Sequence, residues 1–328
     1  MLAILACFVA ATSAGAAERY AILVSGAAGS EAHATQHAEW REALATALRE
    51  RMKLPPERII VLGDPEAERR AGREVSPDLL PATRDNVRDT FTRLAQTVKK
   101  EDVVFVVLFG HSTYDGVYAK FNLLGPDLEA ADWKALTSPL AGRVVFVNTT
   151  GASAPFLQRL AGDNRIVITA TDNPAQKYET VFPRYFVEAF TEPESDLDKD
   201  GRVSMWEAFA HASAGVRQYY RQRGQLAVEK SVLDDTGDGV GKDAAGTGPD
   251  GSLASRTFVD TEDDPARAAG PALSELINRR NVLEAEFDEL KRRRSFMPPG
   301  DYEKRREELL IEIARVSRRI RAEQAKRS

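Results

Sequence analysis

The sequence predicts an α/β protein whose architecture is a three-layer α/β/α sandwich around a mostly parallel sheet. Short, nearly continuous apolar runs recur through the first two thirds of the chain, as strands buried on both faces of a parallel sheet require. Longer stretches with helical periodicity separate these runs. The composition, with 43% hydrophobic and 29% charged residues, is that of a globular protein. In such a sandwich, ligands usually bind at the carboxyl ends of the strands.

The expected strands and helices alternate along the chain. The most hydrophobic strand follows Asp102, where Val, Phe and Leu residues run without interruption to Phe109. Strands are expected at 20–25, 58–62, 102–109, 143–147 and 165–170. Helices are expected at about 35–52, 84–98, 154–160, 184–190 and 205–220.

The segment from Met1 to Ala17 is apolar and ends in small residues, the pattern of a secretory signal and its cleavage site. The only cysteine, Cys7, lies within it, so a cleaved mature protein contains no thiol. A periplasmic or secreted location follows. An uncleaved anchor is the alternative, although the run is short for a membrane span. Later segments do not reach transmembrane length, so we expect no stable span after cleavage.

The C-terminal residues 271–328 predict a helical hairpin, connected to the rest by an acidic Gly- and Asp-rich loop and linker at 226–270. Two apolar stripes at helical spacing flank a break at 295–300, as in a short antiparallel coiled coil. The segment 271–328 carries 15 Lys and Arg against 11 Asp and Glu, while the whole chain has a net charge of −5. Because the two signs are interspersed, we expect a solvated face and no nucleic-acid binding. Pairing within the chain is favoured; a homodimer or an envelope partner bound through 271–328 is the alternative.

Polar residues follow two of the expected strands at the edge where ligands bind. The strand at 102–109 opens into a turn containing His111, and the strand at 143–147 opens into a turn containing Thr150 and Ser153. If the two strands are adjacent, His111 lies near the second turn.

With these turns in place, the region 18–225 resembles the caspase and legumain class of cysteine peptidases. In that class the catalytic histidine follows one sheet strand and the cysteine follows the next. The resemblance rests on the order of the strands, on Leu108 to His111, on the spacing to the second turn, and on Ile168 to Asp172, which looks like the border of the family's substrate cleft.

The sequence departs from that family at the catalytic positions. Thr150 stands at the position of the cysteine, and Ser112 replaces the glycine that usually follows the histidine. A thiolate forms readily beside a histidine, whereas an alcohol needs a well-aligned base during attack. Ser153 has a primary hydroxyl, but a serine before Ala154-Pro155 is ordinarily a helix N-cap.

Two functions are consistent with this pattern. The favoured one is a pseudopeptidase that binds a peptide or protein ligand in the cleft between His111 and Thr150, or that scaffolds partners. The alternative is a peptidase or esterase in which His111 activates Thr150 or Ser153. A further pair, His33 and His37, lies four residues apart on one helix face. Because no third ligand is obvious, an exposed pair is favoured over a zinc site.

The segment 196–207 matches the twelve-residue EF-hand calcium loop. Hard oxygen ligands at these offsets suit Ca²⁺, Gly201 allows the central turn, and Val203 occupies the usual apolar position. We expect a single structural calcium site, with an acidic helix-capping loop as the alternative. The ligands would be Asp196, Asp198, Asp200, Arg202 through its backbone carbonyl, Ser204 through water, and Glu207 as a bidentate carboxylate.

A second acidic stretch begins at Asp234 in a similar way. The twelfth position from Asp234 is Ala245, which has no carboxylate. We therefore expect a polar turn within a long surface loop that runs to Gly251.

Overall fold

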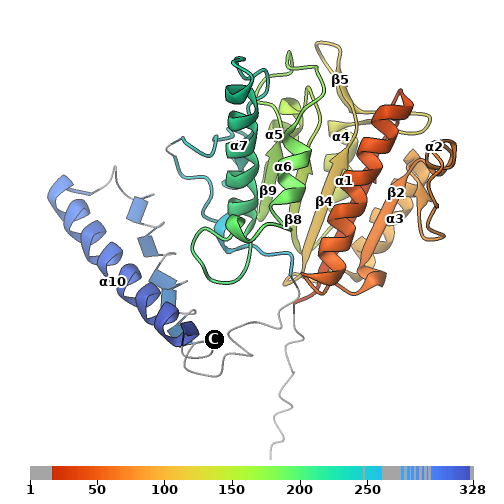
Figure 1. The fold of residues 1–328 in the computed structure, drawn as a ribbon. Helices are drawn as coiled ribbons and strands as arrows, with labels where there is room; N and C mark the ends of the chain where they lie inside the picture. Colours follow the sequence, from red (N-terminus) through yellow and green to blue (C-terminus); the bar gives the residue numbers. More distant parts are fainter. Residues whose placement is uncertain are drawn as a thin grey trace, which may run out of the picture.

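The sheet at the centre of the molecule has helices on both faces (Figure 1). The computed structural model describes residues 17–246 and 248–260 and, towards the C-terminus, residues 275–276, 279–280, 282–283, 286–287, 290–291, 294 and 297–325. The strand order is β10-β9-β8-β4-β1-β2-β3. Neighbouring strands are parallel, except that β10 is antiparallel to β9. The predicted α/β sandwich with a mostly parallel sheet is therefore confirmed.

The described strands and helices have the following bounds. The large sheet consists of β1 Arg19–Ser25, β2 Ile59–Gly63, β3 Leu80–Pro81, β4 Val103–Phe109, β8 Arg143–Asn148, β9 Arg165–Thr169 and β10 Val232–Asp234. A small antiparallel sheet consists of β5 Ser112–Tyr114, β6 Ala119–Phe121 and β7 Leu128–Glu129. The α-helices are α1 Glu31–Glu50, α2 Pro65–Arg70, α3 Arg84–Thr97, α4 Ala130–Thr137, α5 Ala154–Leu160, α6 Phe182–Glu188, α7 Met205–Gln222 and α10 Pro299–Ala325. Short 3₁₀ turns lie at Pro56–Arg58, Pro193–Ser195 and Ala254–Arg256.

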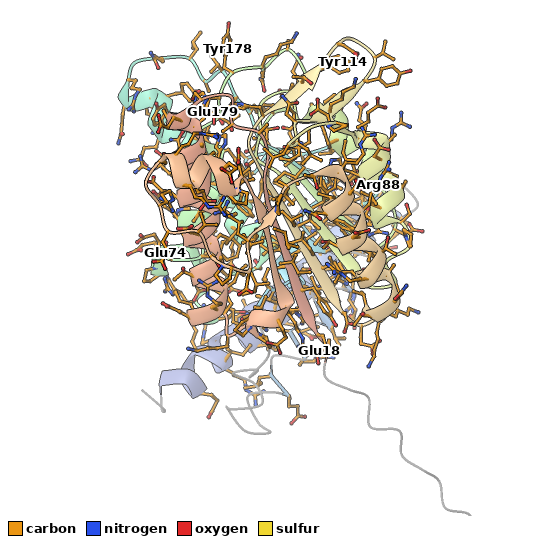
Figure 2. All side chains as sticks on the ribbon, turned by 90° about the vertical axis from the view of Figure 1, so that its right-hand side faces the viewer. Glu18, Glu74, Arg88, Tyr114, Tyr178 and Glu179 are labelled. Atoms are coloured by element: carbon orange, nitrogen blue, oxygen red, sulfur yellow. The ribbon has the colours of Figure 1, made fainter. Side chains whose placement is uncertain are left out.

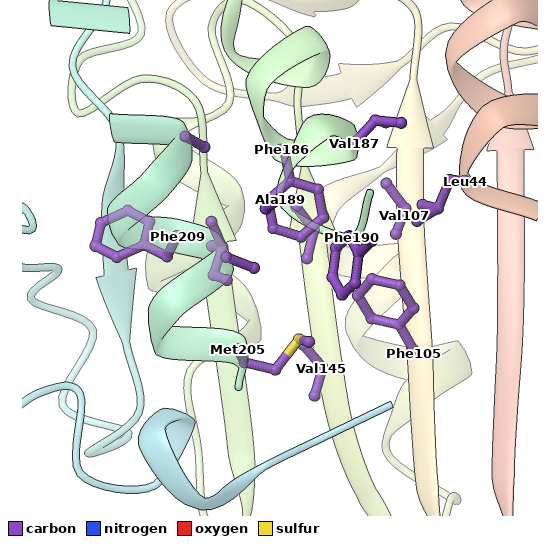
Figure 3. Packing of buried hydrophobic residues seen from close by; sticks show 14 of the residues in the cluster. Leu44, Phe105, Val107, Val145, Phe186, Val187, Ala189, Phe190, Met205 and Phe209 are labelled. Carbon is purple, nitrogen blue, oxygen red and sulfur yellow. The ribbon is translucent and has the colours of Figure 1, made fainter. Parts of the chain in front are cut away.

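The central strand β4 is buried along its whole length, and its side chains alternate between two cores. Phe105 and Val107 belong to the core shared with α1, α6 and α7. Val104 and Val106 belong to the core shared with α3, α4 and α5. Figure 3 shows Phe105 below Phe186 of α6 and below Phe190, and its ring centroid lies 6.3 Å from that of Phe186. The continuous apolar run thus reflects burial on both faces, as expected.

Side-chain caps fix the starts of two helices near the carboxyl edge of the sheet. Helix α1 begins at Glu31, four residues earlier than expected, because the Ser30 hydroxyl accepts a hydrogen bond from the backbone N–H of His33. Helix α6 begins at Phe182, where the Glu229 carboxylate accepts hydrogen bonds from the N–H groups of Val181 and Phe182. Both caps anchor segments that contribute side chains to the site described below.

Several short elements were not anticipated by the sequence patterns. They are β3, the small sheet β5 to β7, the helices α2 and α4, and the edge strand β10. The expectation of a surface loop beginning at Asp234 is wrong at its first residue, because Asp234 ends β10 and is only 1% exposed. Strands of two or three residues are too short to display a two-residue periodicity.

The C-terminal region contains α10 and, before it, further residues in helical conformation. Apolar side chains from both predicted stripes form one hydrophobic cluster that is separate from the two cores of the sheet. Its buried members are Leu276, Leu283, Leu290, Tyr302, Leu309, Val316 and Ile320. Figure 1 shows α10 beside the main body, on the side of α7.

Two expectations concern the N-terminal segment. The predicted signal from Met1 to Ala17, with Cys7 in it, lies outside the described residues apart from Ala17. Among the residues that the structure does describe, no helix combines the length and the apolar character that crossing a membrane requires.

Candidate functional site

The turns that carry His111 and Thr150 follow adjacent strands. β4 and β8 are parallel neighbours, with Leu108 opposite Asn148, so both turns emerge at the same edge of the sheet. Figure 2 shows Tyr178 and Glu179 at this carboxyl edge, at the same end of the molecule as Tyr114 and opposite Glu18. The sequence correctly predicted the neighbouring position of the two turns.

The segment 176–180 passes directly over the turn after β8. Its Gln176 carbonyl accepts a hydrogen bond from the Ala152 N–H at 2.6 Å, and the Thr180 hydroxyl donates to the Thr149 carbonyl. The contact is so close that a Cβ atom added at Gly151 would lie 2.5 Å from the Tyr178 carbonyl oxygen. This segment therefore covers the turn that carries Thr150.

Thr150 is 1% exposed, and its hydroxyl belongs to a buried polar network. The hydroxyl oxygen lies 2.6 Å from the Ser112 hydroxyl and 2.7 Å from the Asn148 side-chain oxygen. The Asn148 oxygen also accepts the N–H of Thr150 at 3.1 Å. These contacts hold the Thr150 hydroxyl within the fold and away from solvent.

Ser153 lies at the start of α5 but does not cap it through its side chain. Its hydroxyl instead lies 3.0 Å from the Thr171 hydroxyl and accepts the Thr171 N–H at 3.2 Å. The Ser153 N–H returns a hydrogen bond to the Thr171 hydroxyl at 2.9 Å. The N-cap interpretation is thus wrong for the side chain, which ties α5 to the segment after β9. Ser153 is fully buried.

Among the described residues, the hydrogen bonds and ion pairs of the His111 imidazole involve neither the Thr150 hydroxyl nor the Ser153 hydroxyl. Its Nε2 lies 2.9 Å from the Ala28 carbonyl oxygen, and its Nδ1 lies 3.2 Å from Oε2 of Glu179. Because a carbonyl oxygen only accepts hydrogen bonds, Nε2 is the donor in its contact with Ala28. The structure therefore joins His111 to Glu179, whereas the sequence suggested Thr150 or Ser153 as its partner.

His33 and His37 lie beside His111 and Glu179. The ring centroid of His111 is 5.1 Å from that of His33 and 5.3 Å from that of His37. His37 donates from Nε2 to Oε1 of Glu179 at 3.0 Å. The expectation of an exposed pair is wrong, because the His37 side chain is only 1% exposed. The further polar partners, His111 and Glu179, lie on segments that are distant in the sequence, so the helical spacing of His33 and His37 does not reveal them.

Glu179 is the functional residue that sequence reasoning missed. It lies in the loop before α6 and belongs to none of the motifs, so no sequence signal marks it. Burial favours its neutral form, but the hydrogen bond from His37 and the charges of His37, His111 and His33 outweigh burial and lower the pKa of Glu179. The carboxylate is therefore ionised among three imidazoles.

The predicted calcium loop brings its carboxylates together. One carboxylate oxygen from each of Asp196, Asp198 and Glu207 lies within 4.8 Å of the others. Gly201 adopts a φ of +91°, as the sharp turn at the sixth position requires, and its N–H donates to Asp196 at 2.9 Å. Glu207 closes the loop, because its Oε1 accepts the N–H groups of Leu197 and Asp198. The donor set and the turn fit a Ca²⁺ ion.

The remaining predicted calcium ligands have other contacts. The Ser204 hydroxyl forms a capping box with Glu207, in which it donates to Oε2 at 2.8 Å and accepts the Glu207 N–H at 3.2 Å. The Arg202 guanidinium pairs with Asp260 and lies over the Phe258 ring, so this side chain is not part of the acidic group.

Asp200 is held by an arginine from the C-terminal region. The Arg280 guanidinium lies 3.3 Å from an oxygen of Asp200 and 3.2 Å from an oxygen of Asp198. Burial, reinforced by the charge of Asp198, raises the pKa of Asp200 to about 6. Burial and the charges of Asp198 and Glu207 thus disfavour the ionised form of Asp200, and a cation in the loop would favour it.

The second acidic stretch forms a turn, as expected. The Asp234 carboxylate accepts hydrogen bonds from the N–H groups of Thr236, Gly237 and Gly239. Asp235 accepts the N–H groups of Gly251 and Ala254. Both carboxylates are therefore used to order the backbone.

Comparisons with known proteins add little to this picture. No protein-family model matches the chain, and no curated protein matches it. Among solved structures, the chain is similar to a crystal structure of a Geobacter sulfurreducens protein determined as a structural-genomics target, with a TM-score of 0.40 and 13% identity. That likeness covers 74% of this chain and 99% of the other. A likeness of this degree carries no argument about function, which must be inferred from the site itself.

Proposed function

We propose that this chain is an exported, calcium-binding pseudopeptidase with a caspase- or legumain-like domain, and that it acts by binding peptide or protein segments. The observation that carries the proposal is the position of Thr150. Its hydroxyl is buried, hydrogen-bonded to Ser112 and Asn148, and covered by the segment 176–180, while both nitrogens of His111 have other partners. A secondary alcohol in such a position has no base and no access to substrate.

Exposed apolar side chains near the same edge support a binding role. Val117, Tyr118 and Tyr178 are 74%, 53% and 77% exposed. A hollow of about 420 Å³ lies between the small sheet and α5, and its walls include Tyr118 and Arg159. Aromatic rings combined with a cationic group are suited to extended peptides with an acidic or aromatic side chain.

The hydrolase alternative is tested by turnover. We expect the mature protein, assayed with calcium present, to leave a library of peptides and esters uncleaved. Thr150→Ala and His111→Ala should give the same result as the wild type. Cleavage by the wild type that either substitution abolishes would refute the pseudopeptidase proposal and support the hydrolase.

The calcium site is tested separately by calorimetry. We expect wild-type protein to bind one Ca²⁺ ion at the loop 196–207, and Asp196→Ala to remove the heat of binding. Asp238→Ala is a matched control, because Asp238 lies in the second acidic stretch, where its carboxylate accepts the Val240 N–H at 2.8 Å. Equal heats for wild type and Asp196→Ala would show that the loop binds no calcium.

A further inference from the structure

We propose that His33, His111 and Glu179 bind a divalent transition-metal ion of the zinc class at the carboxyl edge of the sheet. This inference goes beyond the proposed function and does not depend on it. The three residues come from the first turn of α1, the turn after β4 and the loop before α6. A ligand atom of each lies within 4.8 Å of the others.

The spacing of two of these atoms already fits one ion. Nδ1 of His111 lies 3.2 Å from Oε2 of Glu179. Nitrogen and oxygen ligands about 2.0–2.1 Å from a tetrahedral zinc ion are separated from each other by about 3.3 Å. A ring nitrogen of His33 lies within 4.8 Å of both atoms and supplies the third ligand of the set.

The geometry between His111 and Glu179 leaves room for a cation. Nε2 of His111 lies 2.9 Å from the Ala28 carbonyl oxygen, and Nδ1, on the other side of the ring, lies 3.2 Å from Oε2 of Glu179. Within the described residues, that oxygen, Oε2 of Glu179, is buried and accepts no hydrogen bond of acceptable geometry. A shared proton must lie on the line between its two atoms, whereas a metal ion lies to one side of that line.

The outer contacts are those that metal ligands usually have. The Ala28 carbonyl fixes the tautomer and orientation of His111, and buried His37 donates to the other oxygen of Glu179. A second-shell carbonyl behind a ligating histidine and a donor behind a ligating carboxylate hold both groups in place. His37 is thus a positioning residue in this site.

The ligand set selects the class of metal. Two imidazoles and one carboxylate suit Zn²⁺ and its neighbours, while the oxygen-only loop at 196–207 suits Ca²⁺. The side chains of His111 and Glu179 are 30% and 29% exposed, so an ion here is reachable from solvent. Three protein ligands leave a fourth position for water or for a carboxylate of a bound segment.

The test is a zinc titration of the mature full chain against a chromophoric chelator, with excess calcium present to occupy the acidic loop. We expect one zinc ion per chain, and at least a 10- to 100-fold loss of affinity in His33→Ala and in Glu179→Gln. His211→Ala is the matched control, because the fourth histidine of the chain lies on α7 and contacts Ser195. It should keep the wild-type affinity.

Binding of Co²⁺ provides a second measurement. The wild type should develop the visible absorption of a four-coordinate Co²⁺ ion, and His33→Ala should lack it. His33 is half-buried, and circular dichroism will report whether the variant is folded. Equal zinc affinities of wild type and His33→Ala, or a wild type that binds no zinc, would overturn the proposal. Both outcomes leave the peptide-binding proposal untouched, since no peptide is involved.

Discussion

At the scale of single residues, Thr150 and Ser153 share one physical constraint. Each hydroxyl is enclosed and already hydrogen-bonded, Thr150 to Ser112 and Ser153 to Thr171. Using either as a nucleophile would first require breaking a buried hydrogen bond, at a cost of about 1–3 kcal/mol for the partner left unsatisfied. Neither hydroxyl is therefore placed for nucleophilic attack on a substrate.

Glu229 allows a prediction about pH. Burial raises the pKa of its carboxyl to about 7 from an ordinary 4.5, against the hydrogen bonds from Val181, Phe182 and Tyr220. Between about pH 4.5 and 7 the folded protein therefore holds a proton that the unfolded chain has released. The contribution of Glu229 to stability is fully present below pH 4.5 and is lost as the pH rises through 7.

The comparison of wild type with Glu229→Gln isolates this effect, since the amide does not titrate. Relative to Glu229→Gln, the unfolding free energy of the wild type should fall by up to about 3 kcal/mol as the pH rises from 4.5 to 7.5. Urea unfolding at a series of pH values measures it. A difference that is constant, or that moves in favour of the wild type as pH rises, would mean that the hydrogen bonds keep the carboxyl charged.

At the scale of elements, the calcium loop and the C-terminal region are linked by charge. Arg280 reaches Asp198 and Asp200 from 80 or more positions away in the sequence. A bound Ca²⁺ ion would compete with this guanidinium for the same oxygens. The loop motif was predictable because its ligands are local, whereas this partner was not.

Removing Arg280 should therefore strengthen calcium binding. We expect Arg280→Gln to raise the affinity by roughly fivefold, which corresponds to about 1 kcal/mol. Arg279→Gln is the matched control, because Arg279 pairs with Glu312 instead. Calorimetry on the three proteins measures the affinities. An unchanged or weaker affinity in Arg280→Gln would show that the arginine does not compete with the ion.

At the scale of the whole molecule, long buried strands and long amphipathic helices were the predictable part of the fold. The run at Val103–Phe109 and the helix at Met205–Gln222 lie where the sequence patterns indicated. The edge strand β10 and the small sheet were missed, because packing and not local pattern defines them. The same reason applies to the site, where Glu179 joins three histidines only after the chain has folded.

Calcium should stabilise the whole molecule, because it binds the folded loop and not the unfolded chain. An ion at 100 times its dissociation constant adds about 2.7 kcal/mol, which raises the melting temperature of a protein of this size by roughly 4 °C. Thermal unfolding with and without calcium measures the shift. Glu207→Gln should abolish it, and a shift that survives in that variant would place the stabilising ion elsewhere.

The central claim is that the carboxyl edge of the sheet binds peptide segments without cleaving them. The most direct measurement is affinity selection from a peptide library in the presence of calcium, with mass spectrometry of both the retained and the released peptides. The account predicts that retained peptides are intact and that Tyr118→Ala reduces their retention. Cleaved products that appear with the wild type and vanish with Thr150→Ala would contradict it.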